Sequence, residues 1–149
     1  MREIKFRGKS KNLNEWCYGT YIFTDDNRNN PFRTEPLKGF HRIVFWCSGD
    51  WNTWVAEEVV PETIGQYTGL KDKNGKEIYE GDIIGCYHRE IKHLIFYNEK
   101  QGRFMAAFNG DMENDYTNLC GLDDSRWNAS KEVIGNIHDN PELIKKEEK

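Results

Sequence analysis

Three residues in the middle of the chain are the strongest candidates for a metal site. Cys86 and His88 are separated by one residue, so their side chains would share one face of a strand, and His93 would return on the next strand. Thiolate and imidazole are zinc ligands. The spacing matches no familiar zinc site, however, and a reduced core cysteine beside exposed histidines explains the same residues. We therefore expect no metal here.

Two further segments match ligand-binding loops only in part. Residues 68–77 carry glycine and lysine as a phosphate-binding loop does, but Glu77 stands where that loop needs Ser or Thr. Residues 111–115 alternate acidic side chains as a calcium loop does, but Tyr116 stands where the EF-hand needs Gly. We expect no nucleotide at residues 68–77, we interpret residues 111–115 as a solvated acidic loop, and we expect no cofactor.

The serines and cysteines form no recognisable nucleophile site. The sequence lacks Gly-x-Ser-x-Gly, and the serines lie in polar turns. Cysteines stand at positions 17, 47, 86 and 120, which excludes a Cys-x-x-Cys pair. We expect reduced thiols, a cytoplasmic location, no catalytic residues and no enzymatic activity.

Basic and aromatic residues alternate in the first third of the chain, a combination that binds single-stranded nucleic acid through phosphate contacts and base stacking. The residues are Lys5, Arg7, Lys9, Lys11, Arg28, Phe32, Arg33, Lys38, Phe40 and Arg42. The opposite interpretation is a solvated strand edge whose charges block association. Because 21 basic residues stand against 25 acidic ones, we favour the second interpretation and keep nucleic acid as an alternative partner.

Three tryptophans, Trp46, Trp51 and Trp54, are concentrated in one short stretch. In a β protein such a cluster belongs more often to the core or a subunit interface than to a base-stacking platform. Together with Arg28 and Arg33, these tryptophans form the candidate partner surface. We expect a homo-oligomer, because an aromatic-rich small β chain often covers a patch with a copy of itself.

Composition limits the class of protein. A chain of 149 residues suits one domain, or two small ones sharing a core. Mean hydropathy is low at −0.87, but an aromatic content of 13% supplies enough apolar area for a core. No segment approaches the roughly 20 apolar residues of a membrane span, and the first residues lack the pattern of a signal peptide. We expect a folded chain with no membrane partner.

Short strands dominate the predicted secondary structure. The predicted strands cover residues 3–7, 16–23, 40–47, 51–60, 63–67, 77–79, 83–87, 91–97, 103–108 and 131–137. Ile4 and Phe6 would share one face of the first strand, and Gly19 would mark a bulge or a close approach in the second. Residues 109–128 predict a loop or a short helix, and Pro141 would begin one or two helical turns.

A repeated glycine organises the centre of the chain. Gly69, Gly75 and Gly81 recur every six residues. The Asn74–Gly75 pair predicts a tight hairpin, and Gly81 before Asp82 predicts a second turn in which the carboxylate accepts backbone N–H groups. We interpret these five residues as a structural motif.

These patterns predict an all-β protein of short antiparallel strands in a barrel-like or sandwich-like arrangement, with little helix. The second half has the rhythm of an SH3-like barrel. We expect a single domain over residues 1–149, with candidate β subdomains at about 1–60 and 61–140 and a short tail at 141–149.

The segment at residues 61–84 resembles the signature of the YopX family of phage and prophage proteins. Residues 2–7 and 132–143 resemble the usual start and end of that family, so the resemblance covers nearly the whole chain. It implies a mostly β protein encoded by phages and prophages of Gram-positive bacteria, and hence the cytoplasm of a bacterial host. It implies no activity, because the family offers no active site to transfer. We expect binding or self-association rather than catalysis; the alternative is a nucleic-acid-binding accessory protein of phage replication or gene regulation.

Overall fold

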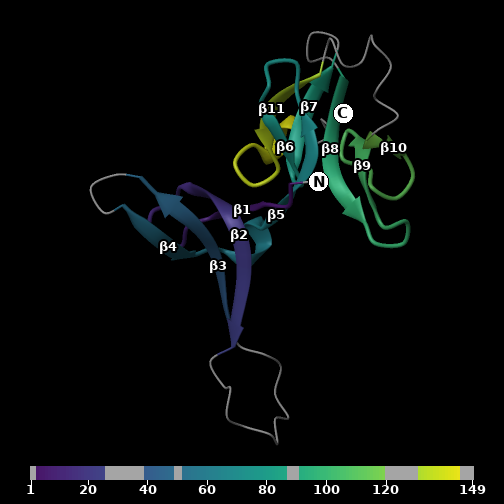
Figure 1. Ribbon diagram of the computed structural model, residues 1–149. Coiled ribbons are helices and arrows are strands. Elements are labelled where there is room, and N and C mark those ends of the chain that lie inside the picture. Colours follow the sequence, from purple (N-terminus) through teal and green to yellow (C-terminus); the bar gives the residue numbers. More distant parts are fainter. Residues whose placement is uncertain (1–2, 26–38, 49–51, 87–90, 120–130, 145–149) are drawn as a thin grey trace, which may run out of the picture. The chain divides into compact units, whose positions relative to one another are not determined.

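The computed structural model describes residues 3–25, 39–48, 52–86, 91–119 and 131–144, and most of these lie in antiparallel strands (Figure 1). The prediction of a mainly β protein with little helix is confirmed. The chain forms two compact units that divide between Gln66 and Tyr67, within one strand. The candidate subdomain boundary lay a few residues earlier, at position 60.

The first unit is an antiparallel sheet in the order β4-β3-β2-β1-β5. Its elements are β1 (Phe6–Lys9), β2 (Trp16–Asp25), β3 (Gly39–Cys47), β4 (Thr53–Glu58), the 3₁₀ turn η1 (Pro61–Thr63) and β5 (Gly65–Lys71). Strand β2 serves two neighbours, because residues 16–19 pair with β1 and residues 20–25 pair with β3.

Gly19 stands where β2 changes neighbours, and it allows a close approach of two backbones. A β-carbon at this position would lie 2.1 Å from the carbonyl oxygen of Val44, so no other residue fits without a backbone shift. Beyond β4, Val59 forms a bridge with Ser10, which follows β1. The core inside this sheet is a cluster of Cys17, Ile43 and Val59 with Phe6, Tyr21, Phe45 and Ile64 packed against it.

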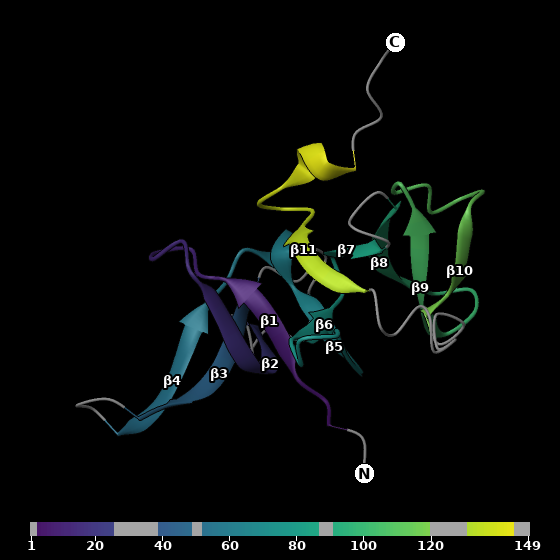
Figure 2. The same cartoon turned by 90° about the horizontal axis from the view of Figure 1, so that it is seen from above.

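The second unit is built on an antiparallel sheet in the order β10-β9-β8-β7-β11 (Figure 2). Its strands are β6 (Glu77–Tyr79), β7 (Asp82–Cys86), β8 (Ile91–Asn98), β9 (Arg103–Phe108), β10 (Tyr116–Asn118) and β11 (Glu132–Asn136), followed by the 3₁₀ turn η3 (Pro141–Leu143). The second half of β5 pairs with β6.

Apolar clusters cover both faces of the second sheet. One contains Ile84, Cys86, Ile95 and Ala106, and the other contains Ile83, Leu94 and Ala107. Because β7 is covered on both sides, all five of its residues are buried. Burial on both faces explains why its sequence is continuously apolar after Asp82.

Both units share one strand order, a four-strand meander whose first strand also pairs with a fifth. This is the order of an SH3-like barrel, which the sequence predicted for the second half alone. Within the described ranges the second sheet stays open, with β10 and β11 at its two ends. A closed barrel is therefore not formed there.

Three local predictions need correction. The first strand begins at Phe6 rather than Glu3, so Ile4 precedes the strand instead of sharing a face of it with Phe6, and it is 66% exposed. The strand predicted from Thr63 begins at Gly65, because Thr63 ends the 3₁₀ turn of residues 61–63 that Pro61 opens. The polar segment after residue 109 contains β10, which was predicted as loop or helix. None of the helices in the described ranges has the length and apolar character needed to span a bilayer.

Candidate interaction surface

The side of the β2–β3–β4 sheet that faces away from the first-unit core carries aligned rows of side chains, which we call the outer face. Cross-strand pairing sets these rows, since directly opposed residues point to the same side. The outer face consists of Thr20, Ile22, Thr24, Phe40, Arg42, Val44, Trp46, Trp54, Ala56 and Glu58.

Trp46 and Trp54 form the aromatic end of the outer face. They are directly opposed on β3 and β4, and their ring centroids lie 5.4 Å apart at an interplanar angle of 77°. Trp46 is 48% exposed and Trp54 is 67% exposed. Isolated exposed apolar residues are normal, but two adjacent exposed indoles beside Val44 and Ala56 are typical of an interaction site.

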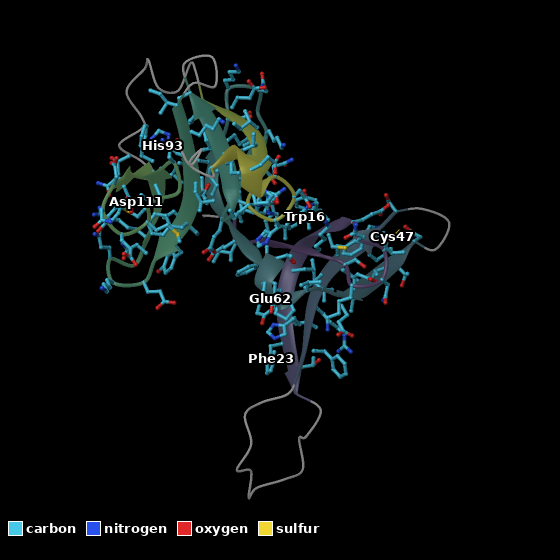
Figure 3. The ribbon with its side chains drawn as sticks, turned by 180° about the vertical axis from the view of Figure 1, so that it is seen from behind. Trp16, Phe23, Cys47, Glu62, His93 and Asp111 are labelled. Atoms are coloured by element: carbon cyan, nitrogen blue, oxygen red, sulfur yellow. The ribbon has the colours of Figure 1, made fainter. Side chains whose placement is uncertain are left out.

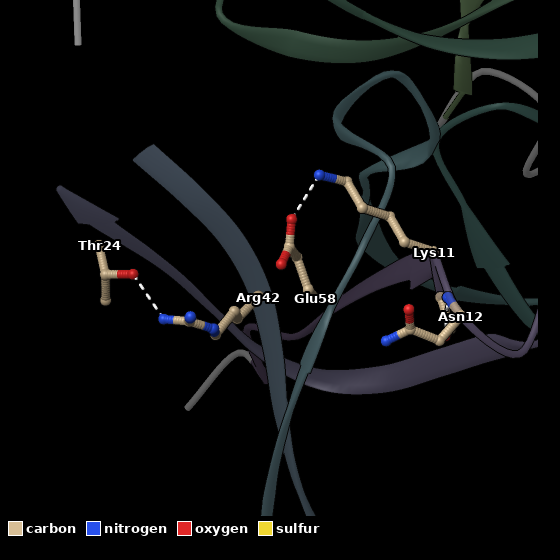
Figure 4. Close-up of polar contacts among 6 residues, drawn as sticks. Lys11, Asn12, Thr24, Arg42 and Glu58 are labelled. Atoms are coloured by element: carbon tan, nitrogen blue, oxygen red, sulfur yellow. Dashed lines mark hydrogen bonds and ion pairs between the residues drawn. The ribbon is translucent and has the colours of Figure 1, made fainter. Parts of the chain in front are cut away.

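Charged residues border the other end of the outer face. Arg42 stacks over the Phe40 ring at 4.7 Å. It also donates a 2.7 Å hydrogen bond from Nη1 to the Thr24 hydroxyl (Figure 4). Lys11 forms an ion pair with Glu58, which is opposite Arg42. The surface is therefore an apolar aromatic patch with a polar border that contains both signs of charge, as subunit interfaces often are.

The opposite side of the same strands is packed with aromatic side chains. The Tyr21 hydroxyl and His41 Nδ1 lie 2.8 Å apart, and the Phe23 ring meets the His41 ring edge-on with centroids 5.0 Å apart. Phe23 lies near the far end of β2, where it is partly exposed (Figure 3). These contacts join β2 to β3 and so fix the positions of the strands that carry the outer face.

The structure contains Trp46 and Trp54 of the candidate partner surface and brings them together. Trp51, Arg28 and Arg33 lie outside the described residues. Sequence reasoning did not identify Val44 and Ala56 as neighbours of the indoles, because membership of a face depends on the pairing register rather than on composition.

The N-terminal basic residues are engaged within the protein rather than collected on a free surface. Arg7 is buried, and its guanidinium lies 4.6 Å from the centre of the Trp16 ring. Lys5 pairs with Glu3 at 3.4 Å, and Lys11 pairs with Glu58. This segment therefore offers less free positive charge than the sequence indicates.

The glycines of the central motif have backbone dihedral angles in the left-handed region. Gly69, Gly75 and Gly81 have φ values of 88°, 80° and 82°. Gly69 lies inside β5, where the pairing with β6 becomes irregular. The Asp82 carboxylate accepts a 2.8 Å hydrogen bond from the backbone N–H of Tyr79. Asn74 does not share this positive φ. Its backbone N–H donates a hydrogen bond to the carboxylate of Asp72.

The Asp72 carboxylate has a structural role that the sequence analysis did not predict. It is buried, and its Oδ1 accepts hydrogen bonds from the N–H groups of Asn74 and Lys76 at 2.8 and 2.9 Å. Its Oδ2 accepts a 3.0 Å hydrogen bond from the N–H of Val133 in β11. One side chain thus orders the β5–β6 turn and fastens it to a strand 61 residues away.

Two of the three candidate metal residues, Cys86 and His93, are buried in the second unit. Cys86 is fully buried, and its desolvation raises the thiol pKa while the charge of Lys131 opposes that rise. His93 is buried on β8 against Phe108. His88 lies outside the described residues. Within the described ranges, no three His, Cys, Asp or Glu side chains are grouped as metal ligands.

The two partial loop matches lie in turns. Residues 68–77 form the end of β5, a turn and the start of β6, with no helix at their end. Asp111 Oδ1 accepts the N–H groups of Glu113 and Asn114, which closes the acidic segment into a local turn.

Comparison with known proteins defines the class. The family described as "YopX protein" matches residues 5–145, so the chain belongs to the YopX family. A similar solved structure is the crystal structure of protein EF1440 from Enterococcus faecalis. The two chains are 27% identical with a TM-score of 0.53, over 97% of this chain and all of that one. No match was found among curated proteins.

Proposed function

We propose that this YopX-family protein is a phage or prophage protein that acts in the bacterial cytoplasm by binding rather than catalysis, and that its principal partner is a second copy of itself. The observation that carries the proposal is the exposed Trp46–Trp54 pair on the outer face. Covering one such ring with apolar surface would contribute about 2 kcal/mol.

The composition of the outer face supports self-association in particular. Its apolar end is uncharged, and its border carries both Arg42 and Glu58, so a copy of the same surface meets no block of like charge. This balance of charge matters because two copies with a net charge of −4 each repel one another mildly.

The proposed cytoplasmic location is supported by the free thiols of Cys17, Cys47 and Cys86, which suit a reducing compartment.

The proposal is tested by measuring the molar mass of the purified protein by light scattering during gel filtration, over a hundredfold range of concentration. We expect the mass to rise from that of a 17.6 kDa chain toward twice that value. A monomer at every concentration and salt would refute self-association.

Nucleic-acid binding is the second proposal, and Arg42 stacked on Phe40 is the observation that favours it. An arginine on an aromatic ring is a common contact for a single strand. Fluorescence anisotropy with labelled single-stranded and double-stranded DNA at several salt concentrations tests this role. Binding that weakens as salt rises would support it, and no binding at low salt would exclude it.

A further inference from the structure

Strand β4 ends the first sheet and leaves a short stretch of backbone open. At the end of this strand, the C=O of Glu58 accepts a 3.0 Å hydrogen bond from the N–H of Lys11, while the N–H of the following Val59 donates to the C=O of His41 in β3. The direction of backbone polar groups alternates along a strand. The N–H and C=O groups of Trp54 and Ala56 therefore point away from β3, as those of Glu58 do.

No described residue pairs with this outward edge between Thr53 and Glu57. The stretch Thr53–Ala56 also lacks the features that usually protect a sheet edge, since it contains no charge, no proline and no bulge. Trp54 and Ala56 are exposed on the outer face beside this edge. An uncharged open edge next to exposed indoles is suited to pairing with another strand.

We propose that a second copy of the chain docks on this edge through antiparallel β4–β4 pairing about a two-fold axis at Val55. This inference rests on the proposed self-association and specifies its geometry. Trp54 of each copy then faces Ala56 of the other, and each of these pairs exchanges both of its hydrogen bonds. The outer faces of the two copies join into one continuous surface, in which Trp54 of one copy covers Ala56 of the other.

The local backbone selects this register over its neighbours. Centring the axis on Trp54 would require pairing from Asn52, whose φ of 39° is not extended. Centring it on Ala56 would require the C=O of Glu58, which Lys11 already occupies. The register centred on Val55 uses both outward-facing residues and places Glu57 opposite Thr53, so no like charges meet.

A cysteine at the two-fold axis gives the direct test. In this register the two Val55 β-carbons lie opposite each other in a non-hydrogen-bonded pair, within reach of a disulfide. Under mild oxidation we expect Val55→Cys to form a covalent dimer whose 55–55 link is located by peptide mass spectrometry. Thr53→Cys in a Cys47→Ser background is the matched control on the same strand, since Cys47 lies directly opposite Thr53 within one chain. It should not link to its counterpart, which lies four residues further along.

A second variant tests the hydrogen bonds. Ala56→Pro removes an outward N–H and leaves the ladder to β3 intact, as proline is tolerated on an open edge. We expect the dissociation constant of the dimer to rise about tenfold or more, with an unchanged far-ultraviolet spectrum. If this variant does not fold, the Val55→Cys result decides.

The possible failures are distinguishable. A wild-type protein that stays monomeric overturns the proposed self-association, and this inference with it. A wild-type dimer that shows no 55–55 link, and whose affinity Ala56→Pro does not change, overturns β4 pairing alone. A link at position 53 in place of position 55 overturns the register.

Discussion

His93 is the one buried imidazole among the histidines that the structure describes. It lies on β8 opposite Ile84 of β7 and Phe108 of β9, and its ring meets the Phe108 ring edge-on with centroids 5.7 Å apart. Desolvation by these neighbours lowers the His93 pKa below 6.5, and the charge of Asp115 only partly opposes that shift. The folded protein therefore favours the neutral ring.

This single residue makes stability depend on pH. As pH falls below about 6.5, the unfolded chain binds a proton on this side chain before the folded chain does. The His93 contribution to the free energy of unfolding is therefore fully present above that pH and decreases below it, by at most about 1.4 kcal/mol per pH unit. We expect urea unfolding at pH 7.5 and pH 5.5 to show a smaller difference for His93→Gln than for the wild type.

The exposed His138 provides the control for this prediction. His138→Gln changes an exposed histidine that does not pack against Phe108, and we expect a larger pH difference for it than for His93→Gln. An equal pH dependence in all three proteins would show that burial of His93 does not influence stability.

At the scale of elements, Asp72 connects the β5–β6 turn to β11 through three backbone N–H groups. Asp72→Asn replaces one carboxylate oxygen by an NH₂ group, which leaves a buried N–H without an acceptor. Such a loss costs about 1–3 kcal/mol. We expect the free energy of unfolding, measured by urea titration at pH 7, to fall by that amount.

Asp111→Asn is the matched control, because Asp111 also accepts two backbone N–H groups but does so in an exposed turn. Its cost should stay within about 0.5 kcal/mol. Equal costs for the two variants would mean that the link to β11 does not stabilise the fold.

The sequence predicts elements better than it predicts what connects them. The strands rich in aromatic and β-branched residues were located correctly to within a few residues. Strand β10 was missed because only Tyr116 among its three residues is apolar, and its pairing with Ala107 of β9 determines its conformation. The role of Asp72 could not be predicted either, because its partner Val133 is distant in the chain and only the folded structure brings the two together.

The candidate surface was predictable only in outline. Three tryptophans close together in the sequence indicated a partner surface, and two of them form an exposed pair. Which residues surround them, and which edge stays open, follow from the register of β2, β3 and β4. A shift of one residue would have turned both indoles toward the core.

At the scale of the whole molecule, two units with the same strand order have different surfaces. The second sheet is covered by apolar clusters on both faces. The first sheet has one covered face and leaves Trp46 and Trp54 exposed on the other. A second copy paired along β4 would cover part of the exposed Trp54, and this self-association is the central claim about function.

Sedimentation equilibrium of the wild type, Trp54→Gln and Tyr97→Gln tests that claim most directly. Tyr97 is an exposed aromatic of the second unit that meets Phe104 edge-on at 5.3 Å, and it is therefore a matched control for Trp54. We predict that Trp54→Gln weakens the dimer at least about thirtyfold, from the loss of about 2 kcal/mol, while Tyr97→Gln associates as the wild type does. Equal association of all three proteins would contradict the account.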